Sequence, residues 1–488
     1  MSNLSELIGG GGGGGSVLEA TASGALANGD IVIVNSDGTV SITQENSAAI
    51  GSPTLFEVPG GTQTTNYISC VFDSNSNKVV ISFSDGGQSN YGKSIVGTVS
   101  GTTISFGTVV IWRSDNTRWV GSAFDSNSNK VVIAYNAGSV TNDGYAIVGT
   151  VSGTSISFGT AVLFDNGFVM STYQNQGVVF DSNSNKIVIF YIDEADGDDP
   201  HGIVGTVSGT SISFGSPVRL SFNRFLYSGA LFDSASNKIV FYGSDANNSS
   251  FGTAIVCNVS GTSLSKGSPV VYDSIATTWT SGAFDVSSGK VVIAYNQSTS
   301  DGYAIVGTVS GTSISFGTKV QFHSAQARDI SAVYDPAAEK VTLAFSNSSG
   351  PAYLTTGTVS GTTIEFNGLT QFESARSVWN STAFDSNSNK VVIGYQDSGY
   401  FTAGTCVVYS NAYNTLKAGN YIGISDGAYS DGATATIQIV GSVDDAQSGL
   451  SAGRAYYVQT DGTLSTTPDD PSVFAGTAVS STQLIVKG

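Results

Sequence analysis

The sequence predicts an all-β fold, a seven-bladed β-propeller of four-stranded blades inserted into a small discontinuous β-rich domain. Three observations predict it. A unit of about fifty residues recurs seven times, each unit holds four strand-like segments, and the last unit lacks one strand that an N-terminal segment can supply. A period of this length indicates a supersecondary unit that buries its apolar face only by stacking on its neighbours.

Each unit is anchored by an aromatic residue and an aspartate, followed by a polar turn, a lysine and an apolar run, as in FDSNSNKVVISF at Phe72. In the second unit, WVGSAFD (119–125), KVVIAY (130–135), YAIVGTV (145–151) and SISFGTAVLF (155–164) are rich in β-branched and aromatic residues, with turn residues between them. This pattern predicts four short antiparallel strands and no helix. The anchoring aspartates are Asp73, Asp125, Asp181, Asp233, Asp285, Asp335 and Asp385.

The ends of the repeat array favour a closed ring. The seventh unit stops at AGTCVVYS (403–410) without a fourth strand, whereas AIGSPTLFEV (49–58) resembles the fourth-strand segment SFGSPVRL (213–220) of another unit. We therefore expect the N-terminal segment to complete the seventh blade, which leaves no open sheet edge. The propeller is predicted over residues 47–410.

The two ends of the chain predict one further domain. LANGDIVIVNSDGTVS (26–41) and LSAGRAYYVQTDGTLS (450–465) align without gaps, and each reads as a hairpin with an Asp-Gly turn of the kind that suits a two-residue connection. Residues 17–46 and 411–488 are predicted to fold together around the inserted propeller. Residues 1–16 form a Gly-rich N-terminal arm, a composition typical of a flexible tether.

Composition excludes several classes of function. The 488 residues carry a net charge of -18, so nucleic-acid binding is not expected. The three cysteines are isolated and indicate neither a disulfide framework nor a zinc site. The N-terminus lacks the features of a signal peptide, and no long apolar run predicts membrane insertion. We expect a protein made in the cytoplasm.

Two turns of each unit are nearly constant, DSNSNK between the first and second strands and VSGTS or VSGTT between the third and fourth. Both lie on one face of the predicted propeller. The aspartate of DSNSNK can accept hydrogen bonds from backbone N–H groups two residues on, which favours a structural turn. A calcium loop is the alternative, but a lysine replaces the glycine of such loops and no acidic residue stands at the twelfth position.

The opposite face is formed by turns that differ in every unit, so it is the predicted binding face. One position recurs on it, five residues before each anchoring aromatic, where the innermost strand begins at the mouth of the central channel. Aromatic rings there suit stacking on sugars, and packing between blades is the alternative. The candidate ligand-binding residues are Tyr67, Trp119, Asn175, Tyr227, Trp279, Asp329 and Trp379.

An acidic loop at 192–202 is the second candidate site. Asp193, Asp196 and Asp198 could contribute oxygen ligands to calcium, although a solvated acidic loop is the alternative interpretation and no other cofactor is indicated. Catalysis is not expected, because nothing selects two of the loop carboxylates, such as Asp115, Asp165 and Asp193, as an acid and a nucleophile, and no repeated Ser-x-Asp-x-Gly-x-Thr-Trp turn is present. We predict that the protein is not an enzyme.

The terminal segments carry a resemblance. GALANGDIVIVNSDGTV near the start, with YIGISDGAYSDGATATIQIVGSVDDAQSGLSAGRAYYVQTDGTLST and AGTAVSSTQLIVKG near the end, resembles a small β module of virion structural proteins of tailed phages, marine and cyanophage-like ones in particular. The leader MSNLSELIGGGGGGG is similar in style. The resemblance implies an attachment or decoration domain from which a variable domain projects.

These observations together predict a non-enzymatic virion protein. The terminal module would dock to other virion proteins, as part of a homo-oligomer, and the propeller would bind host-surface glycans as a tail-fibre or receptor-binding protein. Weak sites would suffice because many copies on one particle raise avidity. A capsid decoration protein is one alternative, and a cytosolic propeller scaffold that binds peptides is another.

Overall fold

The computed structural model describes residues 16–487 apart from 36, 58–63, 139–141, 167, 170–176, 298–300, 349 and 401. Residues 1–15 of the predicted Gly-rich arm lie outside the described residues. The chain divides into two compact units, one formed by Met1–Ala48 with Ala412–Gly488 and the other by Ala49–Asn411. In the described residues no helix is long and apolar enough to cross a membrane.

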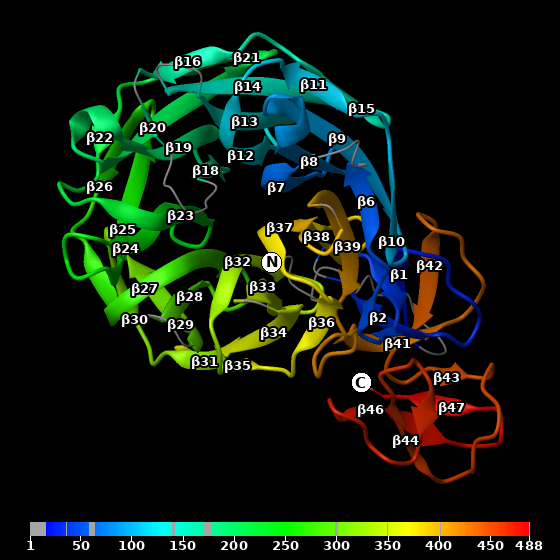
Figure 1. Cartoon of the computed structure of the whole chain (residues 1–488). Coiled ribbons are helices and arrows are strands. Elements are labelled where there is room, and N and C mark those ends of the chain that lie inside the picture. The colour runs from blue at the N-terminus through cyan, green and yellow to red at the C-terminus, as the bar shows by residue number, and fades with distance from the viewer. Residues whose placement is uncertain are drawn as a thin grey trace. The chain divides into compact units, whose positions relative to one another are not determined.

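The larger unit is a β-propeller, and Figure 1 shows its blades arranged in a ring. Within the described residues each of the seven repeats forms an antiparallel blade, with its strands in chain order from the centre outward. Blade 1 contains β7 (Thr65–Asp73), β8 (Lys78–Asp85), β9 (Tyr91–Ser100), β10 (Thr103–Phe106) and β11 (Val110–Arg113). Blade 2 contains β12 (Thr117–Asp125), β13 (Lys130–Ala137), β14 (Asp143–Ser152), β15 (Ser155–Phe158) and β16 (Val162–Asp165). Blade 3 contains β17 (Phe168–Val169), β18 (Val178–Asp181), β19 (Lys186–Asp193), β20 (Asp199–Ser208), β21 (Ser211–Phe214) and β22 (Val218–Arg219).

Blades 4 to 6 follow the same order, and one long strand, β27, serves blades 4 and 5 in turn, whereas the outermost strands of blade 7 are β5 and β6 from the N-terminal segment. Blades 4 to 7 contain β23 (Phe225–Asp233), β24 (Lys238–Asp245), β25 (Phe251–Ser260), β26 (Ser263–Lys266) and β27 (Val270–Asp285); β28 (Lys290–Gln297), β29 (Asp301–Ser310), β30 (Ser313–Phe316) and β31 (Val320–His323); β32 (Ala327–Asp335), β33 (Lys340–Asn347), β34 (Ala352–Ser360), β35 (Thr363–Phe366) and β36 (Thr370–Glu373); and β37 (Ser377–Asp385), β38 (Lys390–Asp397), β39 (Ala403–Ser410), β5 (Ala49–Ile50) and β6 (Thr54–Glu57). Two short 3-10 turns, η2 (Gly86–Gln88) and η3 (Glu194–Asp196), interrupt loops of blades 1 and 3.

The second strand of each blade is a continuous apolar run because a neighbouring blade covers each of its faces. In β13, every residue from Val131 to Tyr135 is buried. The innermost strands contact one another in cyclic order, from β7 through β12, β18, β23, β27, β32 and β37 back to β7. The apolar core therefore lies between the blades.

The predicted closure by an N-terminal strand is confirmed. Strand β39 of blade 7 pairs with β5 through Tyr409 and Ile50, and with β6 through Thr405 and Leu55. Phe56 of β6 packs against blade 1, with its ring centroid 5.3 Å from that of Phe83. The N-terminal segment thus joins the last blade to the first.

Serines near the centre link neighbouring blades by hydrogen bonds that the sequence analysis did not anticipate. Ser281 Oγ accepts from the N–H of Ala332 at 3.0 Å, and Ser331 Oγ accepts from the N–H of Thr382 at 3.0 Å. Ser381 Oγ accepts from the N–H of Cys70 at 2.9 Å. These bonds connect blades 5, 6, 7 and 1 across the point where the ring closes.

The fourth strand was predicted as one continuous segment, and this is wrong, because a glycine divides it into two short strands. In blade 2, a Cβ on Gly159 would stand 1.9 Å from the carbonyl oxygen of Thr210 in the VSGT turn of blade 3. The same close approach recurs at the five pairs Gly51–Thr102, Gly107–Thr154, Gly215–Thr262, Gly267–Thr312 and Gly317–Thr362. The strand breaks where the next blade's turn approaches the backbone.

Blade 6 has Asn367 in place of this glycine. Its neighbour, blade 7, has no VSGT turn, because its fourth strand comes from the N-terminal segment and β39 ends at Ser410. The side chain of Asn367 therefore has room that the equivalent glycines lack. The exception follows directly from the closure.

Gly159→Ala is expected to lower the free energy of unfolding by about 1–3 kcal/mol, because the added methyl group overlaps a backbone carbonyl that cannot move aside freely. Gly368→Ala is the matched control, since nothing lies within 4 Å of a Cβ at Gly368. Chemical denaturation of both variants checks the prediction. Equal stabilities would contradict the proposed role of the glycine.

The smaller unit contains two sheets and a short ladder. Its strands are β1 (Val17–Thr21), β2 (Ile31–Val34), β3 (Val40–Ile42), β4 (Glu45–Asn46), β40 (Tyr413–Asn414), β41 (Tyr421–Ser425), β42 (Thr434–Gln438), β43 (Val443–Asp444), β44 (Ala455–Val458), β45 (Leu464–Ser465), β46 (Val473–Ala478) and β47 (Leu484–Val486). Strand β4 pairs with β40, so the chain segments that lead to and from the propeller lie side by side.

The two sheets have the same topology. One has the order β1-β42-β41-β2-β3 and the other β43-β47-β46-β44-β45, with equivalent strands in the same chain order. Each has a bulge beside a glycine: Gly423 lies opposite Val32, and Gly476 opposite Tyr456. The smaller unit is therefore two copies of one module, and the propeller interrupts the first copy where the second has only residues 466–472.

Both predicted terminal hairpins form, β2–β3 and β44–β45. The expectation of a two-residue turn is wrong. In the second hairpin Gln459 N–H donates to the Thr463 carbonyl at 2.8 Å, which leaves a three-residue loop. Gly462 has a φ of 84° whereas Asp461 does not have a positive φ, so the loop is a turn followed by a left-handed glycine.

Candidate functional site

The constant face of the propeller is formed by the DSNSNK hairpins, and the structural interpretation of their aspartate is confirmed. Asp73 Oδ1 accepts hydrogen bonds from the N–H groups of Asn75 and Ser76 at 2.9 and 3.0 Å. The other six anchoring aspartates make the same pair of bonds. These carboxylates therefore shape the turns.

On the opposite face, the repeated candidate position adopts an unusual backbone conformation. Every described member of the set is in the left-handed region, with φ between 49° and 55°: Tyr67, Trp119, Tyr227, Trp279, Asp329 and Trp379. Each lies at a bulge where the innermost strand shifts register against the second strand. Asn175 lies outside the described residues. A bulky residue in this region costs about 1–3 kcal/mol, so the surrounding structure must enforce it.

The aromatic members form two groups and not an evenly spaced ring. The Tyr67 centroid lies 4.7 Å from that of Trp119 and 4.5 Å from that of Trp379, and the two tryptophans are 6.0 Å apart. Tyr67, Trp119 and Trp379 are called the aromatic trio below. Tyr227 and Trp279 form a separate pair at 5.2 Å.

All five rings are partly buried. Trp119, Trp379 and Tyr67 each also pack against an apolar core cluster, so packing accounts for part of each side chain. The same rings remain partly exposed to solvent. Packing between blades and partial exposure of the ring, which the sequence offers as alternatives, therefore occur together at this position.

Asp329 occupies the same position in blade 6, but its carboxylate is used internally. Its Oδ1 accepts from the N–H of Trp379 at 3.0 Å, and its Oδ2 pairs with Arg376 at 3.2 Å. Burial raises the pKa of Asp329, while Arg376 acts in the opposite direction. Asp329 is 1% exposed, so it positions Trp379 and does not present a surface of its own.

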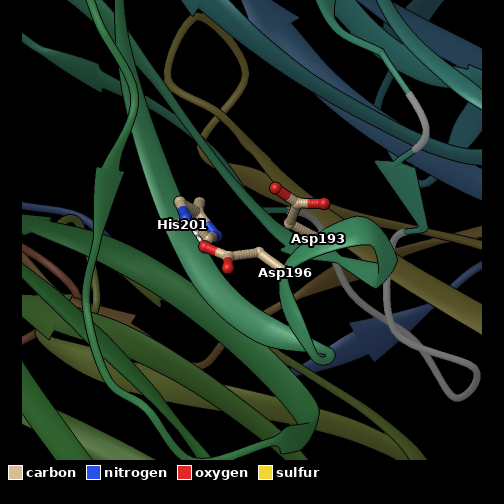
Figure 2. A group of neighbouring side chains, drawn as sticks. All are labelled: Asp193, Asp196 and His201. Atoms are coloured by element: carbon tan, nitrogen blue, oxygen red, sulfur yellow. Dashed lines mark ion pairs between the residues drawn. The ribbon is translucent and has the colours of Figure 1, made fainter.

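The acidic loop brings together a set of residues that differs from the predicted one. Asp193, Asp196 and His201 place one atom each within 4.8 Å of one another, and Figure 2 shows Asp196 directed at the His201 ring. Asp198 pairs instead with Arg224 at 3.4 Å. The His201 Nε2 lies 3.4 Å from Asp196 Oδ2.

This set does not fit calcium. Arg219 forms an ion pair with Asp196, so a guanidinium already balances the carboxylate that a cation would need. Asp193 Oδ1 accepts from the N–H of Ala195 at 2.9 Å and caps η3. A buried histidine also supplies nitrogen, whereas calcium prefers oxygen ligands. The interactions favour a structural loop held by Arg219.

One titratable residue, not recognised from the sequence, recurs at the same position of each fourth strand; in six blades it ends the last short strand, and in blade 4 it lies within the long strand β27. These residues are Glu57, Arg113, Asp165, Arg219, Asp273, His323 and Glu373. Several reach the next blade: Tyr295 OH donates to Asp273 at 2.8 Å, and Tyr395 OH donates to Glu373 at 3.2 Å. A signal was available, since a titratable residue recurs at the end of an otherwise uncharged strand.

No protein-family model matches the chain, and no curated protein matches it. Among solved structures, the BP39L lectin from Burkholderia pseudomallei is similar with a TM-score of 0.51 at 10% identity, over 72% of this chain and 99% of that one. A chain of the mitotic checkpoint complex has a TM-score of 0.49 at 10% identity, over 74% and 92%. Trypanosoma rangeli sialidase has 0.37 at 13%, over 72% and 60%. The first likeness establishes the β-propeller fold.

Proposed function

We propose that the propeller is a non-enzymatic glycan-binding domain whose variable face binds sugars at the aromatic groups. The observation that carries the proposal is the left-handed conformation shared by the six described residues at the innermost bulge. Strain of this kind is common at ligand sites, because a folded chain retains it only where the rest of the structure enforces it. At five of these six residues, all except the buried Asp329, it holds an aromatic ring that is partly exposed to solvent.

Aromatic faces bind sugars by stacking on their apolar C–H surfaces, with polar groups at the edge of the ring to fix orientation. The aromatic trio offers three such rings from blades 7, 1 and 2. A propeller of similar fold is itself described as a lectin, which agrees with the proposal. We further propose that the duplicated terminal module attaches the chain to a virus particle, as its resemblance to tailed-phage modules implies.

The expected role is a tail-fibre or receptor-binding protein that meets other virion proteins through the terminal module, as a homo-oligomer. The two alternative functions are capsid decoration and a cytosolic scaffold that binds peptides. Mass spectrometry of purified particles would find the chain in the virion for either virion role. Recovery of the chain with soluble host proteins alone would favour the scaffold.

A glycan array tests the sugar-binding proposal. The full chain is expected to bind a subset of glycans, and Trp119→Ala with Trp379→Ala is expected to abolish that signal, since each lost ring removes about 1 kcal/mol or more of stacking. Phe222→Ala is the control, because Phe222 is 80% exposed and lies outside the aromatic groups. Unchanged thermal unfolding would show that the double variant still folds. A signal that survives the double substitution would overturn the proposal.

A further inference from the structure

The arginines of the propeller gather on its variable face. All six lie at the end of a fourth strand or at the entry to an innermost strand: Arg113, Arg118, Arg219, Arg224, Arg328 and Arg376. The seven repeat lysines, by contrast, begin the second strands at the constant face. In a chain with a net charge of -18, this places guanidinium groups on the face that carries the aromatic groups.

Four of these arginines have carboxylate partners. Arg113 pairs with Asp115, Arg224 with Asp198, Arg376 with Asp329, and Arg219 with Asp196 and Asp199. Among the described residues, Arg118 and Arg328 have no carboxylate within ion-pair distance. Arg328 Nε donates to Gln326 at 3.0 Å, whereas Arg118 is exposed.

Arg118 adjoins the aromatic trio. It directly precedes Trp119 in β12, and its charge acts on the Tyr67 hydroxyl: burial raises the pKa of Tyr67, and Arg118 opposes that shift. Its side chain also runs along the backbone of Gly138, where a Cβ would meet Arg118 Nε at 3.3 Å. The guanidinium thus belongs to the residue directly before Trp119 of the aromatic trio and, among the described residues, has no carboxylate within ion-pair distance.

We infer that the aromatic trio and Arg118 together bind an acidic sugar, one that carries a carboxylate. This inference rests on the proposed glycan-binding function. The rings supply stacking surfaces, and the planar guanidinium matches the two oxygens of a carboxylate. A neutral sugar would gain nothing from an unpaired cation, and a chain this acidic would otherwise repel an anionic ligand.

Isothermal titration with two matched pairs of probes tests the inference on the full chain. One pair is a short oligogalacturonide and its methyl ester, and the other is sialyllactose and lactose. The native chain is expected to bind at least one acidic probe roughly 10- to 100-fold more tightly than its neutral partner, since hydrogen bonds to charged groups contribute about 1.5–3 kcal/mol. Added sodium chloride is expected to weaken that difference.

Arg118→Gln is expected to reduce the affinity for the acidic probe to that for the neutral partner, and to leave the neutral affinity unchanged. Arg224→Gln is the matched control, because Arg224 lies on the same face but is already paired with Asp198. Equal binding of acidic and neutral probes, or no binding of either acidic probe, would overturn the inference, while a positive glycan array would leave the proposed function intact. Failure of the array as well would overturn both.

Discussion

Replacing Lys93 by alanine is expected to lower the free energy of unfolding by about 3–5 kcal/mol. The Lys93 ammonium pairs with Glu57 Oε1 at 2.9 Å and with Asp85 Oδ2 at 2.5 Å. The three residues are 7%, 8% and 1% exposed, respectively. Without the lysine, two buried carboxyl groups of like charge would face each other with no compensating cation.

The effect is large because of where this cluster lies. Glu57 belongs to β6, the closing strand of blade 7, whereas Lys93 and Asp85 belong to β9 and β8 of blade 1. Loss of the pair therefore weakens the contact that closes the ring. Burial raises the pKa of Glu57, although Lys93 opposes the shift, so lower pH should restore part of the variant's stability by protonating that group.

Lys319→Ala is the matched control for this prediction. Lys319 pairs with Asp273 at 2.9 Å, but its side chain is 32% exposed, and Asp273 keeps hydrogen bonds from Tyr295 and Gln297. Its loss is expected to cost about 1 kcal/mol or less. Urea denaturation of both variants measures the difference. If Lys93→Ala lowered the free energy of unfolding no more than Lys319→Ala does, the prediction that the Lys93 ion pairs stabilise the ring closure would be wrong.

Mild acid is expected to stabilise the protein, contrary to the usual acid denaturation. Among the described residues, burial is the largest cause of a raised pKa at seven carboxyl groups: Glu57, Asp193, Asp199, Asp329, Asp335, Asp397 and Asp444. A folded-state pKa above the unfolded value means that the folded protein binds the proton more readily. The resulting stability is fully present below the ordinary pKa of about 4 and is lost as pH rises through the raised values.

The midpoint of thermal unfolding should therefore increase as the pH is lowered from 7 toward about 4.5. The net charge of -18 acts in the same direction, because protonation reduces self-repulsion. Hydrogen bonds lower the pKa values of Asp37 and Asp469, which oppose the trend, but Asp37 is exposed and Asp469 is only partly buried, so solvent and salt screen their effect. Calorimetry across this range checks the prediction, and Asp329→Asn should flatten the slope. A midpoint that decreases as the pH is lowered from 7 toward about 4.5 would contradict the prediction.

Much of the propeller could be predicted from the sequence because its information is local or periodic. The apolar run KVVIAY identifies a buried strand by itself, and the repeat places every copy of it. The closing strand was visible because residues 49–58 match a segment that the seventh unit lacks. The same periodicity located the candidate ring position, since Trp119, Trp279 and Trp379 recur at one offset from the anchor.

The tertiary structure alone decided how those positions meet. The left-handed bulge at Trp119, the grouping of three rings and the internal use of Asp329 depend on contacts between blades about fifty residues apart in the chain. The break at Gly159 and the tolerance of Asn367 depend on whether a neighbouring turn is present. The sequence by itself determined the repeating unit and its order, because hydrophobic period and turn residues act over a few positions. Packing between units determined the site, because a strained backbone or an unpaired guanidinium is defined only by its neighbours in space.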